Sequence, residues 1–382
     1  MCIRDRLRDV LPEDIESRLI GELTGGDRAL ISSLEGFEDL ELMGRLQLED
    51  RGIHKGDMVF GITEGGETSS VIGAVFAALD QYGEIDSEME EEARQHIFFL
   101  YNNPDEVLEP FARSRKVLEH PALTRINLTT GPQAVTGSTR MQAATIETYV
   151  MGAILEEGIR DVLEEHLSPS EMQSLGFEPE EDSDPSQEGP RTPGFRIAER
   201  LLSFDELREA LSGRLEDTAR FTALESDTYA MGRRSLYFAG RALIPVFVDC
   251  TERSPTFRLH PLDTSSEPEK KCWLQVWTDA EDQVGAWKRF LGRPFRGLER
   301  ECYYPHFVIE ITDSWLREAA LKSLSHAGND QEGLYDFSFS EERAKGRDPL
   351  PGDLAVVVCV DEEIRELKDE SAVVDANHPL AG

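Results

Sequence analysis

Residues 56–83, "GDMVFGITEGGETSSVIGAVFAALDQYG", decide the fold because they join a strand pattern to a helix pattern through a glycine-rich loop. Residues 56–63 form a short apolar, β-branched run after a Gly-Asp turn, which predicts a buried strand. Residues 69–83 repeat apolar side chains at helical spacing and end at Gly83, which predicts a helix with glycine at its carboxyl end. A strand, a loop and a helix in this order are the building unit of an α/β protein.

The same succession continues along the first half of the chain. Further strands are predicted at 96–104 and 124–132, and a long helix is predicted to end near Leu167. Alternating strands and helices predict a parallel sheet that is flanked by helices. In such sheets ligands bind at the carboxyl ends of the strands, so the loops after the strands are the places to look for a site.

A second α/β pattern occupies the rest of the chain. It follows residues 168–195, a stretch rich in Ser, Pro, Glu and Asp that we interpret as a linker or a crossing without regular structure. The two halves together predict two similar domains from a diverged duplication. Strands are expected at 241–250, 271–280, 304–313 and 353–363, and helices at 282–292 and 314–328.

Composition limits the partners of the protein. The 382 residues correspond to about two domains, and the net charge of −35 argues against nucleic acid and anionic lipid as partners. No apolar run approaches the roughly 18 residues of a membrane span. The five cysteines are scattered without a CxxC pair, and the histidines have no metal-ligand spacing, so we expect neither disulfides, metal nor cofactor, and a cytoplasmic location.

The loop "GITEGGETSS" (61–70) has the chemistry of an anion site. Gly65 and Gly66 let backbone amides approach a ligand closely. Thr68 and Ser69 come at the start of the helix, where free amides and the helix dipole favour an anion. The loop contains neither GK[ST] nor GxGxxG, which argues against a nucleotide P-loop and a dinucleotide site. The alternative is that these hydroxyl groups are only helix caps.

A second hydroxyl-rich loop opens the stretch "TTGPQAVTGSTRMQAATIETYVMGAIL" (129–155). Thr136, Ser138, Thr139 and Arg140 precede a long helix pattern, and Arg140 can bind a carboxylate or phosphate through two N–H groups. Two such loops at strand ends predict a shared anion-binding cleft, with a sugar phosphate as the favoured ligand. The acidic net charge does not oppose this, because surface charge is screened over roughly 8 to 10 Å.

Carboxylates also occur in "SSLEGFEDL" (32–40), which we predict to be helical. Glu35, Glu38 and Asp39 lie there, and carboxylates on a helix are most often solvated surface residues. Their residue types alone therefore do not predict a function.

Three segments resemble the sugar isomerase (SIS) domain of N-acetylmuramic acid 6-phosphate etherase and of glucokinase regulatory protein. They are "GGDRALISSLEGFED" (25–39), "GITEGGETSSVIGA" (61–74) and "GPQAVTGSTRMQAAT" (131–145), within a resemblance that spans roughly residues 20–165. In the second half, "VDCTERSPTF" (248–257) and "AWKRFLGRPFRGLE" (286–299) resemble the second SIS domain of the glucokinase regulatory protein group.

The resemblance implies two tandem SIS-type domains of flavodoxin-like, three-layer αβα architecture with a parallel sheet. We place them at 15–168 and 196–382, joined by an acidic linker at 169–195. The opening "MCIRDR" looks like translated adapter sequence, and the chain stops on "DANHPLAG" without a closing element. We therefore expect a fragment whose first domain is truncated at its N-terminus and whose second is incomplete at its C-terminus.

Site residues follow from the resemblance by position. The second Glu of "EGxED", here Glu38, is a catalytic acid/base residue in the etherase. The other catalytic Glu of the etherase lies in a "SEcPPT"-type motif that the first half of this chain lacks, whereas Glu252 in the second half stands in the similar "TERSPTF". The family's sugar-phosphate contacts map to Thr63, Gly65, Gly66, Thr68, Ser69, Ser138, Thr139 and Arg140.

Two departures weaken etherase chemistry. Residues 65–68 read Gly-Gly-Glu-Thr where the etherase has Ser-Gly-Arg-Thr, and Gln142 stands in place of the lysine of "RMKAG". Both changes remove positive charge near the ligand. They favour a binding protein that resembles glucokinase regulatory protein, with a hexose phosphate as ligand and a sugar kinase as partner.

The alternative is an etherase-like lyase in which Glu38 acts on a proton alpha to a carbonyl and a lactyl ether is expelled. An isomerase of the same fold is disfavoured, because the chain shows no recognisable base and histidine for it. The sequence leaves enzymatic activity open. It also leaves an oligomer open, since family members commonly pair domains across the cleft.

Overall fold

The structure is a computed structural model. Its described residues are 18–34, 36–136, 138, 140–177, 193–254, 256–339 and 350–360. They belong to two compact units. One unit comprises Met1–Gly21 and Ala144–Thr218, and the other comprises Glu22–Ala143 and Ala219–Gly382.

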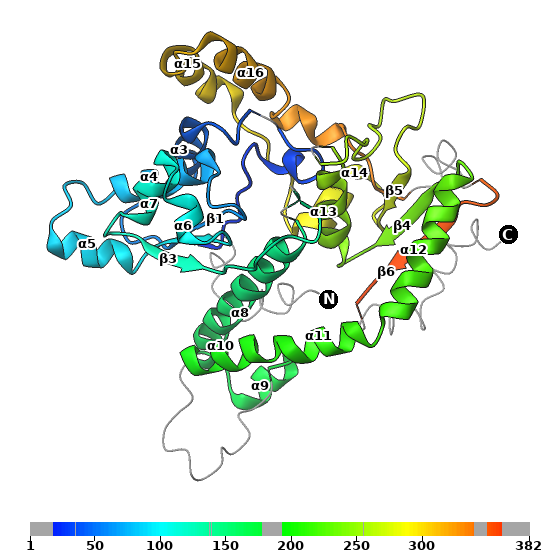
Figure 1. The fold of residues 1–382 in the computed structure, drawn as a ribbon, viewed down its shortest axis with the longest axis horizontal. Coiled ribbons are helices and arrows are strands. Elements are labelled where there is room, and N and C mark those ends of the chain that lie inside the picture. The colour runs from blue at the N-terminus through cyan, green and yellow to red at the C-terminus, as the bar shows by residue number, and fades with distance from the viewer. Residues whose placement is uncertain are drawn as a thin grey trace. The chain divides into compact units, whose positions relative to one another are not determined.

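The first sheet contains three parallel strands in the order β1-β2-β3 (Figure 1). Its strands are β1 (Val59–Ile62), β2 (Ile97–Tyr101) and β3 (Thr124–Asn127), and the long helix α8 (Gln142–Glu164) follows β3. The connecting helices are α4 (Ser69–Asp80), α5 (Ser87–Arg94), α6 (Asp105–Leu108) and α7 (Ala112–Leu118). These strands, the helix that starts at Ser69 and the parallel pairing confirm the prediction for this half.

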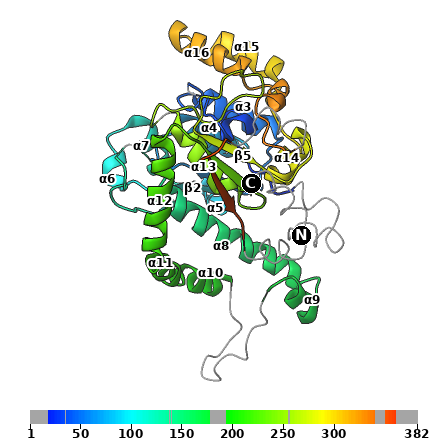
Figure 2. The same cartoon turned by 90° about the vertical axis from the view of Figure 1, so that its right-hand side faces the viewer.

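The second sheet is also parallel, in the order β5-β4-β6. Its strands are β4 (Ser235–Ala239), β5 (Leu274–Trp277) and β6 (Leu354–Val358). Helices α13 (Leu243–Arg253) and α14 (Gln283–Leu291) lie beside this sheet and share its apolar core (Figure 2). The strands expected at 271–280 and 353–363 are confirmed, as is the helix at 282–292.

The strand expected at 241–250 is wrong, because this segment forms α13. Its buried residues Leu243, Val246, Phe247 and Cys250 are spaced i, i+3, i+4 and i+7, which is the pattern of a helix with one apolar face. A nearly continuous apolar run hid this spacing. The central strand β4 lies a few residues earlier, where the sequence analysis expected none.

The strand expected at 304–313 is also wrong, because α15 (Arg300–Glu310) covers most of it. Tyr303 and Phe307, one helical turn apart, are the buried residues of α15. Aromatic and β-branched side chains suggested a strand, but the packing of this helical face against α16 (Ser314–Ser325) decides the structure.

The segment 32–40 is not the predicted helix. After the short 3₁₀ helix η1 (Asp27–Leu30) the chain makes turns, and α3 (Glu41–Asp50) begins only after Leu40. Leu34, Phe37 and Leu40 of this segment pack in one core with α15 and α16, whereas Ile31 just before it joins the core of the second sheet.

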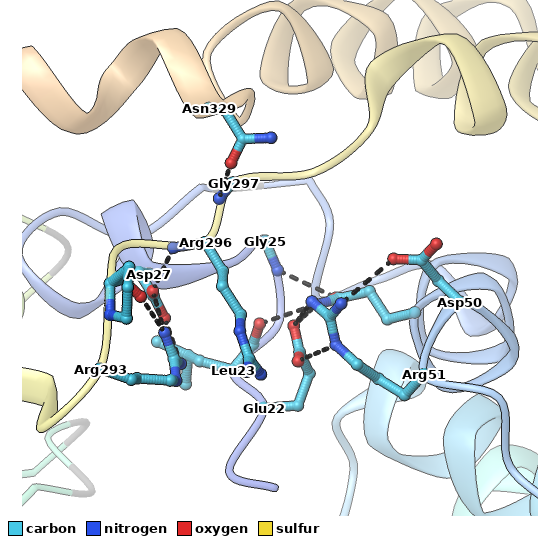
Figure 3. A network of polar contacts seen from close by, with 12 residues as sticks. Glu22, Leu23, Gly25, Asp27, Asp50, Arg51, Arg293, Arg296, Gly297 and Asn329 are labelled. Atoms are coloured by element: carbon cyan, nitrogen blue, oxygen red, sulfur yellow. Dashed lines mark hydrogen bonds and ion pairs between the residues drawn. The ribbon is translucent and has the colours of Figure 1, made fainter. Parts of the chain in front are cut away.

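Polar contacts hold the residues around η1 in place (Figure 3). The buried Asp27 carboxylate accepts hydrogen bonds from Arg293 Nη1 and Nη2 at 2.6 and 2.9 Å, and from the Arg296 backbone N–H at 2.6 Å. On the other side, Glu22 accepts from Arg51 Nε at 2.6 Å and from Nη2 at 3.1 Å. The segment that leads into "EGxED" is therefore fixed at two points.

The stretch predicted as a linker contains regular structure. Helix α9 (Pro169–Ser174) starts with a capping box between Ser168 and Glu171, and α10 (Pro193–Leu202) follows residues 178–192, which lie outside the described part. The remaining elements are α11 (Phe204–Ser212), α12 (Leu215–Ala230) and the 3₁₀ helix η2 (Asn329–Gly333). The domain boundaries at 15–168 and 196–382 stay a prediction. No helix among the described residues is both long and apolar enough to cross a membrane.

Candidate functional site

The two predicted loops meet at one edge of the first sheet. The loop after β1 starts at Thr63, and the loop after β3 leads to Arg140 and α8. Because β1 and β3 both run parallel to β2, their carboxyl ends point to the same edge. Arg140 Nη1 donates to Glu64 Oε1 at 3.3 Å, so the two loops are in direct contact.

A third segment reaches the same place from the second sheet. Glu252, at the end of α13, accepts a hydrogen bond from Ser138 Oγ on Oε1 at 2.8 Å and from Arg140 Nε on Oε2 at 3.0 Å. The hydroxyl of Thr256 also donates to Glu252 Oε1. Glu252 is only 7% exposed, and a buried carboxylate needs such donors to offset its lost hydration. The "TERSPTF" and "GSTRM" motifs thus form one polar cluster.

Arg140 is already paired inside the protein. Its guanidinium contacts the carboxylates of Glu252 and Glu64, and its side chain keeps 29% exposure. The sequence predicts that Arg140 pairs with a ligand. That contact stays a prediction, and the structure adds two internal carboxylates with which a ligand would share this cation.

The loop after β1 owes its shape to its glycines. Gly66 has φ +78°, and an added Cβ would lie 2.6 Å from Leu108 Cδ1, so only glycine fits there. Its carbonyl accepts from Ser114 Oγ at 2.9 Å, and the Gly65 carbonyl accepts from Asn103 Nδ2 at 2.8 Å. Groups that follow β2 in the chain therefore fix the loop beside the strand ends.

The hydroxyl group of Thr68 does not cap α4. Thr68 is the residue before α4, yet its side chain makes no cap hydrogen bond. Its hydroxyl instead shares a 2.7 Å hydrogen bond with the buried Thr63 hydroxyl. Ser70 Oγ is likewise occupied, at 2.9 Å from Thr24 Oγ1. The alternative that these residues are only helix caps therefore does not describe Thr68.

Arg113 is a site residue that sequence reasoning missed. It lies at the start of α7, and its Nη1 and Nη2 stand 3.4 Å from Ser69 Oγ and from Glu67 Oε1. The guanidinium brings a positive charge to the loop next to Glu67, the acidic residue that stands where the etherase has arginine. No local pattern signals this contact, because Arg113 is 44 residues from Ser69.

Glu38 lies at a turn and is exposed. Its backbone carbonyl accepts from the Ser70 N–H at 3.0 Å, which places the main chain of "EGxED" against the first turn of α4. The structure therefore brings the Glu38 backbone to the loop after β1. Thr139 and Glu35 lie outside the described residues.

A polar cluster ties the ends of β2 and β3 to α6. The Tyr101 hydroxyl donates to Asp105 Oδ1 at 2.6 Å, Asn127 Nδ2 donates to the same oxygen at 2.8 Å, and Arg125 Nη1 donates to Oδ2 at 3.1 Å. The hydrogen bond from Tyr101, and then Asn127 and Arg125, hold the pKa of Asp105 below its ordinary value. This cluster holds the end of β3, from which the second loop begins, against β2 and α6.

Within the described part of the chain, no group of three or more His, Cys, Asp or Glu side chains is arranged to hold a metal ion. The described groups at the strand ends are hydroxyl groups, backbone amides, two guanidinium groups and several carboxylates. Such a set can bind a phosphorylated, hydroxyl-rich molecule and can transfer protons.

Parallel sheets with polar strand-end loops define the class of this protein as an α/β protein with a candidate site at the sheet edge. No protein-family model matches the chain. Over 145 residues it is 29% identical to N-acetylmuramic acid 6-phosphate etherase 1 of Bacillus licheniformis. The matched region covers 38% of this chain and 39% of that relative.

Two further relatives agree. Over 136 residues the chain is 32% identical to the N-acetylmuramic acid 6-phosphate etherases of Yersinia pestis and Yersinia pseudotuberculosis, covering 36% of this chain and 39% of each relative. The chain thus spans about two fifths of the length of these curated relatives. The similarity supports a relationship to the SIS-domain family. Because these relatives are etherases, it favours the etherase-like alternative over the regulatory one.

Proposed function

We propose that the protein binds a phosphorylated sugar at the edge of the first sheet and acts on it as an etherase-like carbon–oxygen lyase. The observation that carries the proposal is the buried Glu252 carboxylate, held by Ser138 at 2.8 Å and Arg140 at 3.0 Å. This contact supplies, from the second half of the chain, a carboxylate of the kind that the first half lacks. The similar proteins are named for N-acetylmuramic acid 6-phosphate, which supports this phosphosugar as the proposed substrate.

The phosphate would bind where positive charge and N–H groups gather. Arg113 contacts Ser69 in the first turn of α4, and Arg140 contacts Glu64 in the loop after β1. Guanidinium groups and helix N-termini are favourable partners for a phosphate dianion. The hydroxyl groups of Thr68 and Ser69 add hydrogen-bond donors.

The proposed reaction needs two proton transfers. A base removes the proton alpha to the sugar carbonyl, the bond between the sugar carbon and the ether oxygen breaks, and an acid protonates the departing lactate oxygen. We assign this pair of roles to Glu38 and Glu252. Ser138 and Arg140 act as positioning residues that hold Glu252 in one orientation. Groups in such roles typically contribute about 10² to 10⁴-fold in rate.

The test is to incubate the full chain with N-acetylmuramic acid 6-phosphate and to measure lactate. Release of lactate that Glu252→Gln reduces at least a hundredfold would support the lyase. Binding of the sugar phosphate without lactate would overturn the lyase and leave a binding protein. Failure to bind would overturn both.

A second candidate, a non-catalytic phosphosugar-binding regulator, rests on the acidic loop. Glu67 and Gln142 stand where the etherase motifs have basic residues, and this departure weakens the case for etherase chemistry. In this candidate a sugar kinase is the partner, as the resemblance implies. The two candidates share the ligand site and differ in turnover, so the lactate measurement separates them.

A further inference from the structure

Arg140 is bound by two carboxylates that differ in burial and reach. Glu252 contacts Nε at 3.0 Å and its side chain is 9% exposed, whereas Glu64 contacts Nη1 at 3.3 Å and its side chain is 25% exposed. Charge-assisted N–H···O bonds are strongest at about 2.7 to 2.9 Å. Glu64 is therefore the looser and more accessible of the two partners.

The Glu64 contact uses a donor that an anionic ligand needs. A guanidinium binds phosphate best through two neighbouring N–H groups that point in the same direction. In Arg140 the Nε edge is taken by Glu252, and the contact with Glu64 takes Nη1. A phosphate that pairs with the outer edge of Arg140 must displace Glu64 and must also approach its negative charge.

The side chain of Glu64 can leave without moving the loop. The Glu64 backbone carbonyl accepts from the Asn102 N–H at 3.2 Å, and the next carbonyl, of Gly65, accepts from Asn103 Nδ2 at 2.8 Å. These bonds hold the main chain at the end of β2. Displacement then requires only rotation of a partly exposed side chain into solvent.

We propose that Glu64 is an affinity-setting residue of the phosphosugar site, which competes with the ligand for Arg140. The proposal rests on the proposed function and adds a specificity element to it. With Glu64 in place the site favours ligands that displace a carboxylate and offer hydroxyl groups to it, and it discriminates against small anions without such donors.

The experiment measures dissociation constants by calorimetry for two probes, inorganic phosphate and N-acetylmuramic acid 6-phosphate. The proteins are the unmodified chain, Glu64→Gln and the control Glu88→Gln, which removes the same charge from an exposed position of α5. We expect Glu64→Gln to bind inorganic phosphate about tenfold more tightly, because a like charge next to the binding cation is gone. The sugar phosphate should gain less, since it also loses an acceptor for its hydroxyl groups. Glu88→Gln should stay within twofold.

Several results would overturn this inference. If the unmodified chain binds the sugar phosphate, and Glu64→Gln binds each probe only as tightly as the unmodified chain does, the inference is wrong and the proposed function stands. If Glu88→Gln gains as much affinity for inorganic phosphate as Glu64→Gln does, the effect comes from net charge and the inference is wrong. If no variant binds either probe, the inference fails together with the proposed site. Circular dichroism of each variant tests whether its fold is unchanged.

Discussion

Ser138 and Glu252 are 114 residues apart in the chain, yet Ser138 Oγ donates a hydrogen bond to Glu252 Oε1 at 2.8 Å. Ser138 is fully buried and Glu252 is nearly so. The contact joins a strand-end loop of the first sheet to the end of α13 beside the second sheet. A site built in this way depends on both halves of the chain, even though each half has its own sheet.

Replacing Glu252 should separate chemistry from folding. In Glu252→Gln the new amide group faces the hydrogen-bond donors of Ser138, Arg140 and Thr256. Its NH₂ group is itself a donor, so it cannot accept a hydrogen bond from them. We expect a loss of about 1 to 3 kcal/mol in unfolding free energy and at least a hundredfold loss of lactate release. Asp249→Asn, one turn earlier on α13 and exposed, is the matched control and should retain activity. Equal losses in both variants would argue against a specific role for Glu252.

Asp27 should be a major contributor to stability. Its carboxylate is buried and receives two N–H groups of Arg293 and one backbone N–H. Asp27→Asn leaves Arg293 without its counter-charge, and breaking a buried pair costs about 3 to 5 kcal/mol. Glu310→Gln removes an exposed pair with Arg45, for which less than about 1 kcal/mol is expected. Urea denaturation of both variants measures the difference, and similar costs would contradict the assignment.

The close approach of α3 and α4 should not tolerate a side chain. A Cβ on Gly44 would lie 1.6 Å from the Ser70 carbonyl oxygen, so the helices would have to separate at the first turn of α4. Overpacking of this kind costs about 1 to 3 kcal/mol or more. Gly152→Ala in α8, with no atom within 4 Å of the added Cβ, should instead stabilise by up to about 1 kcal/mol. The midpoint temperatures of thermal unfolding should shift in opposite directions, downward for Gly44→Ala and upward for Gly152→Ala.

The cysteines should differ in reactivity. Burial raises the pKa of Cys272 to about 11 and that of Cys250 well above its ordinary value, whereas Cys302 is exposed. Only the thiolate reacts with iodoacetamide. At pH 8 we expect Cys302 to be alkylated before Cys250 and Cys272, with the rate at Cys272 rising as the pH approaches 11. Mass spectrometry of peptides reads this order, and early labelling of Cys272 would show that its environment opens.

Sequence patterns were sufficient where one periodicity dominated. In residues 56–83, and again at β2, a short apolar run is followed by a polar loop. The parallel sheet and the positions of both loops could therefore be predicted. Segments 241–250 and 304–313 failed because a run of apolar and aromatic residues fits both a buried strand and a buried helix. The tertiary contacts of Phe247 and Phe307, absent from any local window, decide between them.

The candidate site was predictable in its residue types but not in its partners. Hydroxyl groups and an arginine before a helix indicate an anion site, and the resemblance adds Glu38 and Glu252. The pairing of Arg140 with Glu64 and Glu252, and the approach of Arg113 to Ser69, join residues 44 to 112 positions apart. Contacts at such separations depend on how strands are ordered, which no local pattern specifies.

The central claim is that Arg140, Ser138 and Glu252 form a single phosphosugar site. Its most direct test is calorimetric titration of the chain with N-acetylmuramic acid 6-phosphate, alongside Arg140→Met. The unmodified chain should bind the sugar phosphate. Arg140→Met should bind at least tenfold more weakly, because it loses a charge-assisted contact to phosphate. Undiminished binding by Arg140→Met, in a protein that remains folded, would contradict the account.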